Sequence, residues 1–141
     1  MKIRTAEEND WAACRHLTEI LENHAFEEDR FRTIFLAQRA SEQYACLMAE
    51  EDGRIVGFLN MHIEAQLHHD RPVARILELA VDPQWRSQGI GALLFGAAEA
   101  TAVQKGCEQI ELETSSWRKR AHAFYEREGM TADHLYYTKK L

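Results

Sequence analysis

The fold is decided by the stretch Leu77–Leu94, whose sequence is LELAVDPQWRSQGIGALL. It begins as an apolar strand, continues through a loop with two glycines and ends as the start of a helix. The first backbone N–H groups of a helix lack intrahelical partners and carry partial positive charge. Gly89 and Gly91 have no Cβ, so a ligand can approach these amides, and Arg86 adds a permanent charge. The stretch therefore predicts an anion site that suits a pyrophosphate. The alternative is a tight turn before a packing helix.

The remaining elements are predicted from hydrophobic periodicity and turn signals. We expect strands at residues 1–5, 44–50, 54–67, 74–81, 109–114 and 135–140, and helices at residues 7–22, 27–40, 90–105 and 116–128. The third helix should pack through a stripe of Ile90, Leu93, Leu94, Ala97 and Thr101. A strand, loop, helix and strand in succession predict a parallel strand pair, within an α/β (α+β) fold whose N-terminal strands are antiparallel.

Composition limits the class of protein. With 141 residues, of which 45% are hydrophobic, the chain suits one domain over residues 1–141. Its formal net charge of -6 argues against nucleic-acid binding and favours a cationic partner such as an amine. Cys14, Cys46 and Cys107 show no metal-like or C-x-x-C spacing, which indicates a reducing compartment. Without a signal-like or membrane-length apolar run, we expect a cytoplasmic protein that does not enter a membrane.

Two motifs together resemble the GNAT superfamily of N-acetyltransferases. The first is Arg86–Gly91, which matches the family pattern of Arg or Gln, two residues, Gly, one residue, then Gly or Ala. The second is Ala121–Met130, with its Phe-Tyr pair. The resemblance implies a GNAT fold: a mixed, mostly antiparallel sheet of six to seven strands, with a parallel, splayed pair at the cofactor site and about four helices. It also implies acetyl-CoA as cosubstrate.

The resemblance assigns most of the cofactor contacts. The loop would hold the pyrophosphate, and the strand before it would bind the pantetheine arm through its backbone. The expected cofactor-binding residues are Leu79, Ala80, Val81, Arg86, Ser87, Gln88, Gly89, Ile90, Gly91, Ala92 and Arg118. Arg118 stands where many family members carry asparagine, so its pantetheine contact is open to question. It belongs to a basic turn, Arg118–Arg120, that either binds a CoA phosphate or an acidic group of the acceptor, or faces solvent near Glu111 or Glu113.

Tyr125 is the candidate general acid. In the family the tyrosine of the Phe-Tyr pair lies near the CoA sulfur, and a phenol of ordinary pKa about 10 keeps its proton at neutral pH. The alternative is a core tyrosine, because Ala121, Phe124, Tyr125 and Glu128 share a helical stripe.

Glu78 is the candidate general base, because it interrupts an otherwise apolar strand where an unpaired carboxylate is costly. In a cleft it could take a proton from a substrate ammonium, directly or through one water. The alternative is an ion pair with Arg54 or Arg75. By resemblance, the backbone N–H near Leu79 or Val81 stabilises the oxyanion.

Histidines in the long strand and its turn offer ligand types for a metal. His62, Glu64 and His68 share one expected strand face, but His62 and His68 would lie about 20 Å apart on a regular strand, which favours solvated or substrate-facing side chains. The chain resembles the aminoalkylphosphonate N-acetyltransferase branch of the family at these histidines and at four further places, which are Glu78-Leu79, Ala121-His122, Phe124-Tyr125 and the terminal Thr138–Leu141. Because a divalent metal has been linked to that branch, a metal is left open, although no residue is assigned to it.

The predicted function is direct acetyl transfer from acetyl-CoA to a primary amine of a small molecule, an aminoalkylphosphonate or similar amine. The segment with His24 and Phe26 is expected to border the substrate cleft. Other functions on the same fold are a catalytically silent acyl-CoA-binding regulator and a peptide or protein N-acetyltransferase. A dinucleotide-binding oxidoreductase is disfavoured, since Leu94 stands where a third glycine is needed. A homodimer is left open, because dimers are frequent in the family.

Overall fold

The computed structural model describes residues 1–141, which divide into two compact units, Met1–Glu111 and Leu112–Leu141. The elements of the first unit are β1 (Lys2–Thr5), the 3-10 turn η1 (Glu8–Asp10), α1 (Trp11–Glu22), α2 (Glu28–Arg39), β2 (Tyr44–Glu51), β3 (Arg54–Glu64), β4 (Val73–Val81), the 3-10 turn η2 (Pro83–Trp85) and α3 (Ile90–Gln104). Strand β5 (Gln109–Leu112) ends where the second unit begins, and the second unit holds α4 (Lys119–Arg127).

The strands form one five-stranded sheet in the order β1-β2-β3-β4-β5. Strands β1 to β4 pair antiparallel, and β4 and β5, which are connected through α3, supply the parallel pair. The hairpin between β2 and β3 turns at Asp52 and Gly53, whose φ angles are 50° and 76°. Two positive φ angles are what a two-residue type I′ turn requires, so the turn predicted from Asp-Gly is confirmed.

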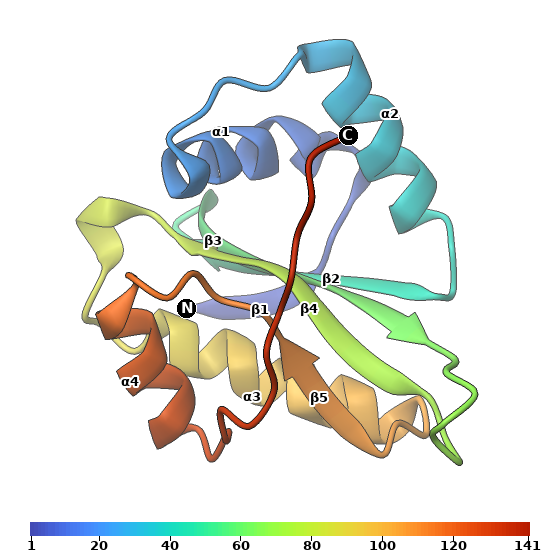
Figure 1. The fold of residues 1–141 in the computed structure, drawn as a ribbon. Helices are drawn as coiled ribbons and strands as arrows, with labels where there is room; N and C mark the ends of the chain where they lie inside the picture. Colours follow the sequence, from blue (N-terminus) through green and yellow to red (C-terminus); the bar gives the residue numbers. More distant parts are fainter. The chain divides into compact units, whose positions relative to one another are not determined.

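Helices α1 and α2 cover one face of the sheet in the first unit (Figure 1). The core on this face joins Cys14 and Leu17 of α1 and Phe35 of α2 to Met48 and Phe58 of the sheet. Each of these side chains is at most 9% exposed. Burial of apolar side chains from both layers therefore fixes the two helices against β2, β3 and β4.

Helix α3 packs on the opposite face (Figure 1). Its Ile90 and Leu94 side chains lie against Gly57 of β3. A Cβ at Gly57 would lie 3.1 Å from the Ala80 carbonyl oxygen and 3.3 Å from side-chain atoms of Ile90 and Leu94. The missing side chain thus allows the helix to approach the sheet.

The predicted packing stripe of α3 is partly wrong. Ile90 and Leu94 are buried as expected, but Leu93 is 50% exposed. The other buried residues are Phe95, Ala98 and Ala102. Because Ile90 and Leu94 meet the sheet at Gly57, the buried line continues through Ala98, and Leu93 is rotated away.

One predicted strand and several predicted boundaries also need correction. The predicted strand at residues 135–140 does not form, so the sheet has five strands rather than six to seven. Leu135 and Tyr137 are 82% and 83% exposed, so the alternating apolar side chains have no buried face to pack against. Strand β3 ends at Glu64 instead of residue 67, where Leu67 is fully exposed, and α4 begins at Lys119 instead of residue 116.

Candidate functional site

The segment that leads from β4 into α3, residues 82–89, is called here the glycine loop. Its start is anchored to the sheet, because the Asp82 N–H donates to the Val56 carbonyl at 2.8 Å. The Asp82 carboxylate then accepts a hydrogen bond from the Gln84 N–H at 2.9 Å and caps η2. The loop therefore leaves the strand in a defined direction before it reaches the glycines.

The last residues of the glycine loop adopt the left-handed backbone region. Gly89, at the N-cap of α3, has φ 80°, and Ser87 has φ 64°. Glycine adopts this region without strain, whereas a serine adopts it rarely. The conformation of Ser87 could not be predicted from its residue type.

The first amides of α3 are open to a ligand. No side chain caps this helix, and a Cβ built on Gly89 would meet no atom within 4 Å. Arg86, Ser87, Gln88 and Gly89 are exposed, and Arg86 forms no ion pair. Uncapped helical N–H groups, with an exposed arginine three residues before Gly89, suit the charge of a diphosphate such as the pyrophosphate of acetyl-CoA.

Strand β4 contains a bulge just before the glycine loop. Its register with β3 places Glu78 opposite Asn60 and Ile76 opposite Met61, so Leu77 has no partner. A bulge of this kind bends the strand and redirects the side chains around it. Here Leu77 and Glu78 both line one cavity.

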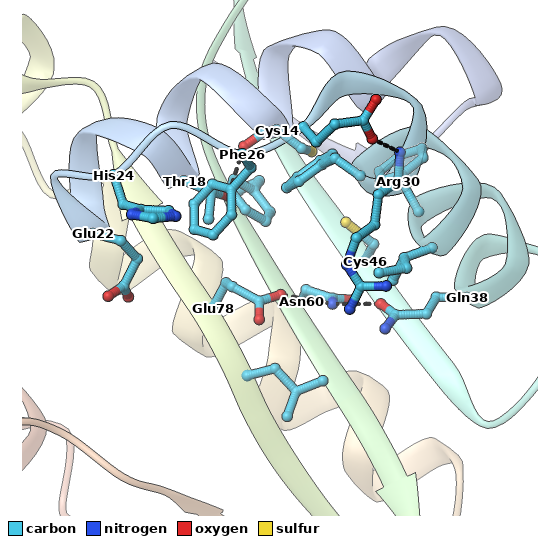
Figure 2. A pocket seen from close by; sticks show the side chains of 16 residues that line it. Cys14, Thr18, Glu22, His24, Phe26, Arg30, Gln38, Cys46, Asn60 and Glu78 are labelled. Carbon is cyan, nitrogen blue, oxygen red and sulfur yellow. Dashed lines mark hydrogen bonds between the residues drawn. The ribbon is translucent and has the colours of Figure 1, made fainter. Parts of the chain in front are cut away.

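That cavity, called here the α2 pocket, has a volume of about 720 Å³ (Figure 2). It lies between α1, α2 and the face of the sheet that they cover. Its lining residues are Cys14, Thr18, Glu22, His24, Phe26, Glu27, Arg30, Phe31, Ile34, Phe35, Gln38, Cys46, Phe58, Asn60, Leu77 and Glu78. The prediction that the segment with His24 and Phe26 borders a cavity is confirmed.

Glu78 is held in the α2 pocket by an amide. The Asn60 Nδ2 donates to a Glu78 carboxylate oxygen at 2.9 Å and to the Gln38 side-chain oxygen at 2.9 Å (Figure 2). Burial raises the pKa of Glu78 above its ordinary value, although the Asn60 hydrogen bond opposes the shift, and the nearby Glu22 carboxylate raises that pKa further. A carboxyl group with a raised pKa in a cavity is suited to proton transfer near neutral pH.

The alternative considered for Glu78, an ion pair with Arg54 or Arg75, is not formed. Arg75 lies opposite His62 and pairs with Glu111 at 3.0 Å, and Arg54 lies opposite Glu51 at the hairpin. Glu78 therefore has an amide partner instead of a cationic one.

Sequence reasoning missed several lining residues of the α2 pocket. Asn60 is 7% exposed inside an apolar strand, so it carried the same signal as Glu78, a polar residue in an apolar run. Glu22 and Arg30 lie on charged helix segments, where such residues usually face solvent, and no local signal distinguished them.

The histidines do not gather into one cluster. The His62 ring stacks on Tyr44 with centroids 4.6 Å apart, and His69 Nδ1 lies 3.3 Å from a Glu108 carboxylate oxygen. The His68 and His69 rings are neighbours, with centroids 4.6 Å apart. Residues 1–141 contain no group of three His, Cys, Asp or Glu side chains that could hold a metal ion.

The second unit carries the second motif. The Arg118 guanidinium lies 4.8 Å from the Trp117 ring, an arrangement typical of a cation–π contact. Tyr125 is half-buried on α4, and its ring centroid lies 5.3 Å from that of Phe124. Burial raises the pKa of Tyr125 above 10, although the Arg118 charge acts in the opposite direction, so the phenol stays protonated at neutral pH.

Two further observations concern the whole chain. None of its helices combines the length and the apolar character needed to cross a membrane. All three cysteines are free, with Cys14 and Cys107 buried and Cys46 half-buried.

Comparison with known proteins identifies the family. The sequence model of the acetyltransferase (GNAT) family matches residues 9–130. An aminoalkylphosphonate N-acetyltransferase of Salmonella typhimurium is 37% identical over 125 residues, which cover 89% of this chain and 80% of the relative.

Solved structures agree with this result. A protein described as a transcriptional regulator from Bacillus halodurans C-125 is 25% identical, with a TM-score of 0.91 and 99% of both chains covered. An aminoglycoside acetyltransferase from an uncultured soil metagenomic sample is 27% identical, with a TM-score of 0.79, covering 99% of this chain and 96% of that one. The chain belongs to the GNAT family, has the GNAT fold, and is an N-acetyltransferase that takes its acetyl group from acetyl-CoA.

Proposed function

We propose that the protein transfers acetyl directly from acetyl-CoA, held at the glycine loop, to a primary amine of a small molecule held in the α2 pocket. The observation that carries this proposal is the course of β4. Glu78 lines the pocket, and only three residues later, at Val81, the strand reaches the glycine loop. Three strand residues span about 10 Å, so one rigid strand serves both sites.

The glycine loop would hold the cosubstrate through Arg86, Ser87, Gln88, Gly89, Ile90, Gly91 and Ala92. The open amides of α3 and the exposed guanidinium of Arg86 support this assignment. The backbone of Leu79, Ala80 and Val81 would bind the pantetheine arm, and Arg118 would add a coenzyme contact. These two assignments rest on the family resemblance.

Glu78 and Tyr125 would move the protons of the reaction. Glu78 takes a proton from the substrate ammonium, directly or through one water, so that the freed amine can attack the acetyl carbonyl. The backbone N–H near Leu79 or Val81 stabilises the oxyanion. As the C–N bond forms and the C–S bond breaks, the Tyr125 hydroxyl donates a proton to the departing thiolate. The raised pKa values of both groups support these roles.

An aminoalkylphosphonate is the first acceptor to try, because the relative from Salmonella typhimurium is named for that substrate class. The α2 pocket supports a small acceptor, since a volume of about 720 Å³ falls in the usual range of ligand pockets. A peptide or protein acceptor would need an open groove along the surface.

The organisation of the protein is also a proposal. We propose that residues 1–141 act as one N-acetyltransferase domain, because the family match extends over both compact units. A homodimer and a cytoplasmic location stay predictions. Three free cysteines suit a reducing compartment.

The proposal is tested by measuring release of free coenzyme A thiol from acetyl-CoA with a panel of amines. The panel includes aminoalkylphosphonates, polyamines, aminoglycosides, amino acids and peptides, each with and without a chelator. We expect release that depends on a small amine, and loss of activity with chelator would reveal a metal. Binding of acetyl-CoA without amine-dependent release would instead favour the silent regulator.

A further inference from the structure

The wall that α2 contributes to the α2 pocket combines three apolar residues, Phe31, Ile34 and Phe35, with two polar ones, Arg30 and Gln38. Arg30, Ile34 and Gln38 are spaced four residues apart on this helix, and all three line the pocket. Residues with this spacing share one face of a helix. The Arg30 side chain extends from α2 into the pocket, toward the hydrogen-bonded side chains of Gln38 and Asn60 (Figure 2).

The Arg30 guanidinium has no partner within the protein. Only its backbone is engaged, because the Arg30 N–H donates to the Glu27 carboxylate that caps α2. Two other arginines, by contrast, are engaged by protein groups. Arg75 pairs with Glu111 at 3.0 Å, and Arg32 lies 5.4 Å from the Trp11 ring. An arginine that lines a cavity without a carboxylate partner is available to a ligand.

A second hydrogen-bond donor, the Gln38 side-chain amide, lies on the same face of α2 as Arg30. The Gln38 side-chain oxygen accepts from Asn60, which orients the amide and leaves the Gln38 Nε2 without a protein partner. A guanidinium and an amide N–H group on one helix face suit the oxygens of a carboxylate, phosphonate or sulfonate.

Three carboxylates also line the α2 pocket. The Glu27 carboxylate, at the N-cap of α2, accepts from the Asp29 and Arg30 backbone N–H groups. Glu78 projects from β4, and Glu22 lies at the end of α1 (Figure 2). Their carboxylates are close enough for Glu22 to raise the pKa of Glu78, so negative charge gathers on that side. The pocket therefore has an anionic region formed by Glu22 of α1 and Glu78 of β4, while on the α2 side the Glu27 carboxylate is engaged by backbone N–H groups and Arg30 supplies a guanidinium.

We propose that Arg30, assisted by Gln38, binds an anionic group of the acceptor while the ammonium of the same molecule faces Glu78. The acceptor is then a short zwitterion, an amine with a phosphonate, carboxylate or sulfonate at its other end. This inference rests on the proposed function, in which the α2 pocket holds the acceptor, and it makes Arg30 the residue that selects an acidic acceptor over a neutral amine.

The test compares acceptors of similar length that differ in the group at the end opposite the amine, which is either an anion or an uncharged methyl. Wild type and Arg30→Gln are assayed with aminoethylphosphonate, beta-alanine, taurine and propylamine, and kcat/KM is measured for each. We expect the ratio of kcat/KM for the preferred anionic acceptor to kcat/KM for propylamine to fall on the order of 10- to 100-fold, since one charge-assisted contact is lost. The three anionic acceptors distinguish phosphonate, carboxylate and sulfonate.

Two control variants complete the series. Arg30→Lys keeps the positive charge but lacks the planar guanidinium, so its kcat/KM ratio should lie between those of wild type and Arg30→Gln. Arg32→Gln removes an arginine from the same helix that does not line the pocket, and it should leave the ratio unchanged. An unchanged ratio in Arg30→Gln, or an equal fall in Arg32→Gln, would overturn the inference.

A binding measurement separates this inference from the proposed function. Ethylphosphonate carries the anion but no amine, so it binds without being acetylated, and calorimetry measures its affinity directly. We expect affinity to fall at least tenfold in Arg30→Gln and to be kept in Glu78→Gln. If wild type acetylates no amine but binds ethylphosphonate through Arg30, the proposed function fails and the anion site stands. If Arg30→Gln binds ethylphosphonate as wild type does, the anion site fails.

Discussion

The glycine loop and the α2 pocket, the sites proposed for the cosubstrate and the acceptor, are built in different ways. The loop is one continuous segment that offers backbone amides at the start of α3, with no side-chain cap. The pocket is assembled from α1, α2, β2, β3 and β4, and it offers side chains. A backbone site depends on the path of the chain, whereas a side-chain site depends on the identity of each residue. Substitutions should therefore affect the two regions differently.

Tyr125→Phe should have the largest effect, because it removes one oxygen atom and leaves the glycine loop intact. Without the proton donor we expect kcat to fall on the order of 100- to 1000-fold, while the Kd of acetyl-CoA changes by less than about twofold. Steady-state kinetics and calorimetry measure the two quantities. Tyr137→Phe, at a tyrosine that is 83% exposed, is the matched control. An unchanged kcat would remove Tyr125 from its proposed role.

Glu78→Gln should impair catalysis in the α2 pocket, because it removes the basic carboxylate while it keeps the shape of the side chain. We expect kcat/KM near neutral pH to fall about 100-fold. The pH profile should also move to higher pH, because only amine that has already lost its proton can then react. Glu99→Gln, at an exposed glutamate of α3, serves as control. If the profile of Glu78→Gln coincides with that of wild type, Glu78 is not the base.

Gly89→Ala tests the glycine loop through its backbone. Gly89 has φ 80°, which a Cβ disfavours by about 1–2 kcal/mol even though the space around it is open. We expect the Kd of coenzyme A to rise about tenfold, because the amides at the start of α3 shift.

Gly106→Ala is a close control for this effect. Gly106 also has φ 80° and open space, but it follows the C-terminal end of α3. It should lose similar stability without a change in coenzyme A affinity. Equal Kd values for the two variants would contradict a backbone site at Gly89.

The smallest expected effect is on stability and arises from burial of Glu78. Its raised pKa means that the folded state holds a proton that the unfolded state releases above the ordinary value of 4.5. Wild type should therefore lose stability as pH rises from about 4.5 until the raised pKa is passed. Relative to wild type, Glu78→Gln should gain stability over this interval, measured by urea unfolding at several pH values. A difference that does not vary with pH would show that Glu78 titrates alike in both states.

Most of the fold could be predicted from the sequence, because helices and strands show their periodicity locally. The glycine loop was predicted for the same reason, since its residues are contiguous. The strand predicted at residues 135–140 was wrong, because alternation alone does not supply a partner strand. The packing stripe of α3 was partly wrong, because Gly57, far away in sequence, determines which side of the helix meets the sheet.

The α2 pocket was predicted only in part. Glu78, His24 and Phe26 were identified, but Asn60 and Arg30 were not. Asn60 contacts Glu78 because the register of β3 and β4 places the two residues opposite each other. Arg30 lines the pocket because α2 faces the sheet. Both relations are tertiary. Asn60 stands out locally as a polar residue in an apolar run, but its partner does not follow from that pattern, and Arg30 has no local signal.

The unpaired residue Leu77 bends β4, but it does not determine the face of the sheet on which Glu78 lies. Arg75, Ile76 and Glu78 oppose His62, Met61 and Asn60, three consecutive residues of β3. A chain shortened by Leu77 would join Ile76 directly to Glu78 and form an uninterrupted ladder, in which the acid keeps its face of the sheet. The strand would nevertheless straighten and lose one apolar wall of the cavity. A single-residue deletion would therefore preserve the acid while changing the shape of the space in front of it.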